Sequence, residues 1–189
     1  MIVKMLYLYK VKGILISVML VSVLGCNTSK SSSEKAILEP TVSYCPDDGT
    51  CSFEVLENKI FSIMADEFGN NYSKLVDGNK TILKFTYTKN KIPDVADGDY
   101  SEIIYIEIEH NTSSLKLEDE GLKSVKAGFS RACFCRGQTG TFPVKIGSLS
   151  ITKLKSSFYE INFDFTITQV PQIIKSINET FKLKKATKI

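Results

Sequence analysis

The chain has 189 residues, of which 43% are hydrophobic and 24% charged, and this composition is that of an ordinary globular protein. It carries 24 basic and 21 acidic side chains, and the excess of three corresponds to Lys4, Lys10 and Lys12 near the N-terminus. The rest of the chain is therefore neutral, which argues against a nucleic-acid-binding protein and against an enzyme of highly charged substrates.

The first 25 residues have the pattern of an export signal. A basic leader over residues 1–12 is followed by an apolar run over residues 13–24. An apolar stretch of about 12 residues is too short to span a bilayer, which needs about 20. A positive leader, a short apolar region and a small residue at the break are typical of a secretory signal, so we expect residues 1–25 to be removed.

The signal ends in Val23-Leu24-Gly25-Cys26, which resembles the lipobox of bacterial lipoproteins. The resemblance covers residues 1–26 and implies that the Cys26 thiol is acylated, that the chain is cut before Cys26, and that the protein is anchored to a lipid membrane. Asn27 replaces the Asp that retains some lipoproteins in the inner membrane, so we expect the outer membrane, in a leaflet that the sequence does not specify. Plain secretion and an uncleaved anchor are the alternatives.

Residues 27–35 are small, polar and rich in Ser, which predicts a flexible tether over residues 26–38. We expect residues 39–189 to form a single domain, because no second boundary and no internal repeat is found there. The dominant hydrophobic period of this part is two, which indicates strands.

Three segments alternate clearly between apolar and polar residues: 83–87, 100–109 and 159–167. Weaker strand candidates are 51–56, 59–65, 113–117, 127–136, 142–146 and 148–154. Turn sequences separate them, namely Asp77-Gly-Asn79, Asp97-Gly-Asp99, Glu120-Gly121, Gly137-Gln-Thr-Gly140 and Ile146-Gly147. Many short strands at this spacing predict an all-β fold, an antiparallel β-sandwich of the Ig-like or a related kind.

The C-terminal segment permits two interpretations. Ile173, Ile174, Ile177 and Phe181 have helical spacing, yet Pro171 precedes them and Asn178-Glu179 is a possible turn. We favour a final β-hairpin over a helix. Residues 147–153, 158–167 and 177–183 also loosely resemble the C-terminal half of small, uncharacterised all-β envelope lipoproteins, which implies the fold but no activity.

Four cysteines remain besides Cys26, and an even number in an exported domain predicts disulfides. Cys133 and Cys135 fall in the predicted strand 127–136, where alternate residues leave the same face with Cβ atoms about 6.6–7 Å apart. A disulfide needs Cβ atoms about 3.5–4.5 Å apart, so a bond between these two requires a bulge.

Cys45 and Cys51 flank the turn sequence Pro-Asp-Asp-Gly, which brings their ends together. We nevertheless favour bonds between the two segments, because a lone bond from Cys45 to Cys51 leaves two thiols in an oxidising compartment. Cross-segment bonds close loops of about 80–90 residues, which contributes about 4–5 kcal/mol in the chain-entropy model. A lone 45–51 bond, a four-cysteine metal site and a thiol redox pair are the alternatives, although zinc sites rarely use Cys-x-Cys and no Cys-x-x-Cys is present.

No catalytic constellation emerges from the remaining residues. His110 is the only histidine, no Gly-x-Ser-x-Gly elbow accompanies it, and we interpret it as an ordinary surface residue. Glu102, Glu107 and Glu109 could supply paired carboxylates for sugar hydrolysis, but Glu107 and Glu109 lie opposite the apolar face of their strand. We therefore expect Glu107 and Glu109 on a solvated outer face.

The loop Asp94-Val-Ala-Asp-Gly-Asp-Tyr-Ser-Glu102 is the best metal candidate, because clustered carboxylates suit calcium. Asp94, Asp97, Asp99 and Glu102 would be the ligands, although their order differs from the repeating Asp-x-Asp-x-Asp-Gly loop. Asp47-Asp48 is interpreted as a turn, and the basic tail over 182–188 as a solvated terminus rather than a contact with anionic lipid.

These observations predict a non-catalytic cell-envelope lipoprotein that serves as a binding or structural module, without a cofactor. Its expected partners are the membrane, through the acylated cysteine, and a polysaccharide or another envelope protein. An envelope hydrolase assisted by calcium is the first alternative, and a thiol redox protein is the second. The hydrolase requires a deep pocket with convergent acids, whereas the module requires a shallow face or an exposed edge.

Overall fold

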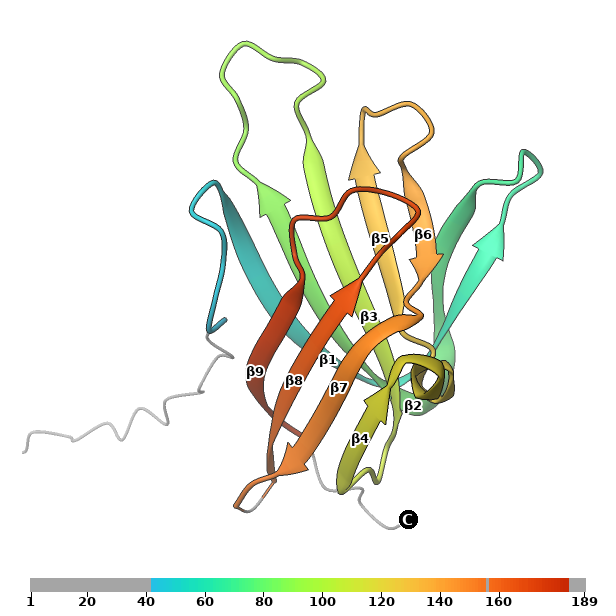
Figure 1. Ribbon diagram of the computed structural model, residues 1–189, viewed down its shortest axis with the longest axis vertical. Coiled ribbons are helices and arrows are strands. Elements are labelled where there is room, and N and C mark those ends of the chain that lie inside the picture. The colour runs from blue at the N-terminus through green and yellow to red at the C-terminus, as the bar shows by residue number, and fades with distance from the viewer. Residues whose placement is uncertain (1–41, 156, 184–189) are drawn as a thin grey trace, which may run out of the picture. The chain divides into compact units, whose positions relative to one another are not determined.

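A computed structural model describes residues 42–155 and 157–183 (Figure 1). The expected signal peptide, Cys26 and the tether lie outside these residues, as does the basic tail beyond residue 183. The strands are β1 (Gly49–Ala65), β2 (Asn71–Lys89), β3 (Tyr100–Glu109), β4 (Ser114–Glu118), β5 (Gly128–Cys133), β6 (Gly140–Pro143), β7 (Ile146–Lys153), β8 (Phe158–Thr166) and β9 (Ser176–Lys182), with a 3-10 helix, η1 (Asp119–Val125), after β4.

The strands form two antiparallel sheets that pack face to face, which confirms the predicted sandwich. One sheet has the order β1-β2-β3-β5-β6 and the other the order β4-β7-β8-β9. Figure 1 places the loops after β2, β5 and β8 at the same end of the sandwich. In the described ranges no helix has the length and apolarity to cross a membrane.

The core lies between the sheets and follows the period of two. From the first sheet, β2 contributes Leu83, Phe85 and Tyr87, and β3 contributes alternate isoleucines starting at Ile104. Opposite them, Phe163 and Phe165 of β8 stack with ring centroids 4.9 Å apart. The predicted C-terminal hairpin is confirmed in preference to a helix, because β9 pairs antiparallel with β8 along its whole length. The possible turn at Asn178-Glu179 is wrong, since both residues lie in the middle of β9.

The helix-like spacing of the last apolar residues arises from a loop and a strand placed in succession. Ile174 is buried in the loop before β9, and Ile177 and Phe181 are inward residues of β9. Glu179 lies between them on the same inward face, so the apolar stripe of β9 is interrupted by a carboxylate.

Three predicted boundaries are wrong, because turn residues here lie within continuous strands, and in β1 and β2 they form bulges. Residues 51–65 belong to one strand, in which Asn58 has a φ of 58° and Lys59 pairs with both Asp77 and Lys80. The sequence Asp77-Gly-Asn79 therefore bends β2 instead of ending it. Gly147 likewise lies within β7, and Glu120-Gly121 belongs to η1.

The bulges bend the distal part of the β1–β2 hairpin, residues 59–77, onto the outer face of the first sheet. We call this segment the folded-back hairpin. Its Phe61 is 1% exposed and stacks on Tyr105 of β3, with ring centroids 4.8 Å apart. Ile82 completes this small second core. The folded-back hairpin thereby covers part of an outer face that the sequence predicts to be solvated.

Candidate functional site

The four calcium candidates do not come together. Glu102 is fully buried, and it accepts hydrogen bonds from the Tyr100 hydroxyl at 2.5 Å and from the backbone N–H groups of Ile173 and Ile174 at 2.7 and 2.8 Å. Asp99 is exposed and pairs with Lys91 at 3.4 Å. No three acidic, histidine or cysteine side chains among the described residues are placed to hold a metal ion. The predicted calcium loop is thus split between a solvated turn and the end of the core.

The surroundings of Glu102 form a closed polar network. Burial raises the pKa of Tyr100 above its usual range, and the hydrogen bond to Glu102 raises it further. The Arg131 guanidinium lies 5.1 Å from the centre of the Tyr100 ring and donates to Gln138 at 2.9 Å. Both Glu102 oxygens accept hydrogen bonds, so this carboxylate positions the loop that precedes β9 rather than acting as a reactive group, although the buried Arg131 Nε has no hydrogen-bond partner.

Both disulfides are local, which corrects the favoured cross-segment pairing. Cys45 bonds to Cys51 and Cys133 bonds to Cys135, with Cα atoms 5.7 and 5.2 Å apart. The second bond is possible because β5 ends at Cys133 and the chain bends at Phe134, so Cys135 is outside the strand. Phe134 is 82% exposed within this small ring. The thiol redox alternative stays a prediction.

The other singled-out residues have structural partners. His110 lies 3.2 Å from the Thr81 hydroxyl through Nδ1. Glu107 is buried under the folded-back hairpin, which corrects its expected solvation, and it accepts the Phe61 N–H at 2.8 Å and pairs with Lys126 at 3.1 Å. Glu109 is exposed and pairs with Lys80, in agreement with a solvated face.

Asp48, in the turn between Cys45 and Cys51, accepts a hydrogen bond from the Tyr87 hydroxyl at 2.8 Å. Burial and this contact raise the pKa of Tyr87 to about 12, and the same bond holds the pKa of Asp48 below its usual range. The turn interpretation of Asp47-Asp48 is therefore supported by a definite structural contact.

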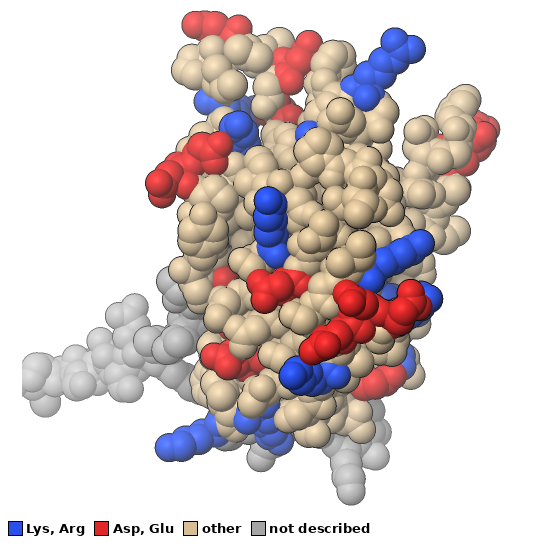
Figure 2. Space-filling model, in the orientation of Figure 1, with Lys and Arg blue, Asp and Glu red and all other residues tan. Residues whose placement is uncertain are grey.

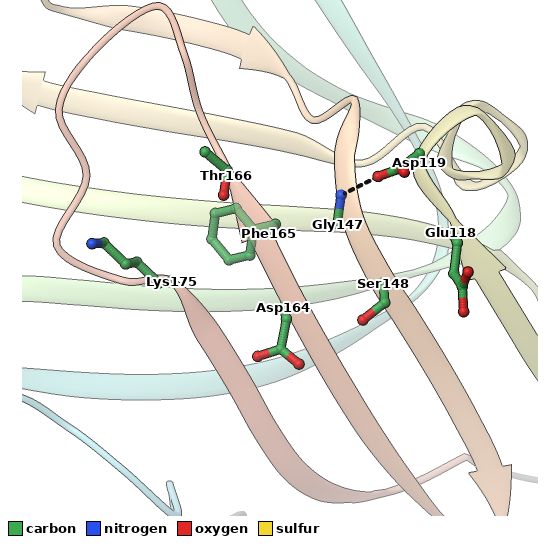
Figure 3. A pocket seen from close by; sticks show the side chains of 8 residues that line it. All are labelled: Glu118, Asp119, Gly147, Ser148, Asp164, Phe165, Thr166 and Lys175. Carbon is green, nitrogen blue, oxygen red and sulfur yellow. Dashed lines mark hydrogen bonds between the residues drawn. The ribbon is translucent and has the colours of Figure 1, made fainter.

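A polar pocket of about 510 Å³ lies on the outer face of the second sheet (Figure 3). Asp119 accepts the backbone N–H of Gly147 at 2.9 Å. Ser148 of β7 lies between Glu118 of β4 and Asp164 of β8, each of which is its cross-strand neighbour. Lys175 lies at the edge of the pocket farthest from Glu118. Figure 2 shows acidic and basic side chains interspersed over this face. The carboxylates thus line an open surface rather than converging on one point.

A second groove, of about 570 Å³, lies between the tip of the folded-back hairpin and the outer face of the first sheet. We call it the hairpin groove. Its lining consists mainly of uncharged hydroxyl, amide and small side chains: Asn70, Asn71, Tyr72 and Ser73 from the hairpin, Ser101 and Ile103 from β3, Ser130 and Ala132 from β5, and Thr139 and Thr141 near β6. Cross-strand pairing places Ser101 beside Ala132, and Ile103 beside Ser130.

The two charged residues at the hairpin groove have partners within the protein. Asp66 accepts hydrogen bonds from the backbone of Phe68 and from the backbone and side chain of Asn70. The Asn70 side chain is the main reason that the pKa of Asp66 lies below its usual range. Arg131 is held by Gln138 over Tyr100. The free hydrogen-bonding capacity of the groove is therefore that of neutral groups.

Sequence reasoning missed the hairpin groove, because its walls come from three separate segments, residues 66–73, 101–103 and 130–141, that only the bent hairpin brings together. One signal was available: the outward positions of residues 101–103 and 130–132 are Ser, Ile, Ser and Ala, where a solvated sheet usually carries long charged side chains.

Comparisons of the chain with protein-family models, with curated proteins and with solved structures gave no match. The functional inference therefore depends on the geometry of these sites.

Proposed function

We propose that the chain is a non-catalytic cell-envelope lipoprotein, anchored through Cys26, whose hairpin groove binds a neutral carbohydrate. The observation that carries this proposal is the composition of the groove, in which neutral hydroxyl and amide groups lie beside a half-exposed aromatic ring. Tyr72 is 45% exposed at the hairpin wall. The proposed location in the cell envelope is inferred from the lipobox resemblance at residues 23–26.

Hydroxyl and amide groups suit a polyhydroxylated ligand because each can donate and accept hydrogen bonds. Ser130 and Thr141 already form a hydrogen-bonded pair at 2.7 Å, which fixes both oxygens on the groove floor. An aromatic ring adds an apolar face on which the CH side of a sugar ring can pack. A site of this kind binds without desolvating a charge, which agrees with the neutral balance of the domain.

The positions of the acids favour a binding module over the hydrolase alternative. Glu102 and Glu107 are buried and are bonded to backbone N–H groups of other segments. Glu118 and Asp164 are separated by a whole strand on an exposed face. A hydrolase of the paired-carboxylate kind needs two carboxyl groups that face one bound bond, and neither pair has this arrangement.

The test uses the chain from residue 26 onward with Cys26→Ser, since this removes acylation and keeps all the residues that the structure describes. Neutral and anionic bacterial-surface oligosaccharides are screened on an array, and hits are measured by titration calorimetry. We expect neutral glycans to bind, and Tyr72→Ala to weaken binding about tenfold by removing the aromatic contact.

Phe68→Ala is the matched control, because Phe68 is 82% exposed at the tip of the same hairpin but does not line the groove. It should leave glycan affinity unchanged. The proposal fails if no neutral glycan binds, or if Tyr72→Ala and Phe68→Ala have the same effect.

A further inference from the structure

A third hollow, of about 270 Å³, differs from the others in chemistry. It lies where Phe61–Ile63 of the folded-back hairpin, the end of η1 and the segment from Pro143 to Lys145 meet. Its deepest side chains are apolar and almost fully buried: Phe61 is 1% exposed, Leu122 0%, Ala127 4% and Val144 3%. The only hydroxyl in its lining belongs to Ser62. We call it the apolar pocket.

The rim of the apolar pocket is cationic. Lys123, Lys126 and Lys145 all line it and are exposed. Lys123 pairs with Glu120 and Lys126 pairs with Glu107, so each has a local counter-charge. Lys145 takes part in no ion pair with another described residue. The rim therefore has one cation in excess beside an apolar hollow.

We propose that the apolar pocket binds the hydrocarbon chain of a fatty acid, with the carboxylate held at the lysine rim. A hydrocarbon tail gains about 0.8 kcal/mol for each methylene removed from water. The apolar interior of the pocket offers almost no hydrogen-bonding partner to a sugar or a peptide backbone, whereas a carboxylate at the rim finds the ammonium group of Lys145. The volume lies just below the usual range for ligand pockets, which suits one hydrocarbon chain rather than two.

This inference is independent of carbohydrate binding, because the two sites share none of their lining residues. Both sites are built on the folded-back hairpin, however, and both require Phe61 to be seated on the sheet. A fold check on each variant is therefore part of the experiment.

The experiment measures binding of dodecanoate, octanoate, dodecanol and dodecylamine by calorimetry, each below its aggregation limit. The protein is the chain from residue 26 with Cys26→Ser, so that no attached acyl group competes. We expect saturable binding of dodecanoate, and binding of octanoate that is weaker by about fourfold for each methylene removed. Dodecylamine should bind more weakly than dodecanol, which has a chain of the same length and no charge.

Lys145→Glu should weaken dodecanoate binding about five- to tenfold, with a dependence on salt, and leave dodecanol unchanged. Lys175→Glu, an exposed lysine on the outer face of the other sheet, is the charge-matched control and should change neither. Ile63→Trp should block all four probes by filling the mouth, while thermal unfolding confirms that the variant is folded.

The proposal is overturned if dodecanoate does not bind saturably. It is also overturned if a folded Ile63→Trp variant binds dodecanoate normally, or if Lys145→Glu and Lys175→Glu act alike.

Discussion

Three glutamates of the described residues are buried, and each accepts at least one backbone N–H from a distant segment. Glu102 holds the loop before β9, Glu107 holds the folded-back hairpin at Phe61, and Glu179 accepts the N–H and hydroxyl of Ser43 at 2.9–3.4 Å. A buried carboxylate loses its hydrogen bonds to water, and hydrogen bonds from backbone N–H groups can replace them. These acids therefore connect parts of the fold and are not available as general acids or bases.

Glu179 predicts a specific dependence of stability on pH. Burial raises the pKa of Glu179, and the bonds from Ser43 offset only part of this rise. Between its unfolded and folded pKa the native state binds more protons than the unfolded state, so the contribution of Glu179 to stability falls as pH increases. The free energy of unfolding of Glu179→Gln, relative to the natural chain, should therefore rise from about pH 4 to about pH 7.

Asp66→Asn is the control, because its effect on the free energy of unfolding should change with pH in the opposite direction. Both variants are unfolded with urea at several pH values. Hydrogen bonds from Asn70 lower the pKa of Asp66, so its contribution to stability is present above the usual carboxyl range and is lost as pH falls. The same pH trend in both variants would contradict the assignment of Glu179.

At the scale of elements, the bent β1–β2 hairpin decides which surfaces exist. A straight hairpin of this length would project beyond the sheet as an exposed ribbon, whereas the bulges at Lys59 and Asp77 direct Phe61 onto Tyr105. The hairpin groove and the apolar pocket both result from this bend. Gly128 permits this bend, because a Cβ at position 128 would overlap the Phe61 ring.

Gly128→Ala is expected to destabilise the protein by about 1–3 kcal/mol through overpacking, measured by urea unfolding. Adding Phe61→Leu should recover part of this loss, because the smaller side chain leaves room for the new methyl group. If the two effects simply add, the hairpin is not seated on Gly128 as described.

At the scale of the whole molecule, side-chain packing holds the two sheets together, and no disulfide among the described residues links one sheet to the other. Phe53 and Phe181 approach across the interface with centroids 5.9 Å apart, and Phe129 lies 6.3 Å from Phe165. The disulfides close loops with sequence separations of only 6 and 2. In the chain-entropy model the first contributes about 2 kcal/mol and the second about 1 kcal/mol, each less than half of what a cross-segment bond would contribute.

Peptide mapping without reduction checks this arrangement. Trypsin should release residues 36–59 and residues 132–136 as separate peptides, each lighter than its reduced form by two hydrogens, because both bonds are internal to a peptide. A linked species that contains both peptides would contradict the local pairing. The reduced sample serves as the reference for both masses.

The alternation of apolar and polar residues determined the strands and the sandwich class, because a period of two sorts side chains onto two faces whatever the partner strand is. The C-terminal hairpin was predictable for the same reason, from the strand over 159–167 and the apolar residues after it.

Only the tertiary structure decided where turn sequences become bulges, which acids are buried, how the cysteines pair, and that two pockets flank one hairpin. These features depend on contacts between residues far apart in the chain. Glu107 and Glu109 illustrate the limit, since both have the same local pattern, yet only Glu107 lies beneath Phe61. A local period specifies the face on which a side chain lies, and it contains no information about which distant segment will cover that face.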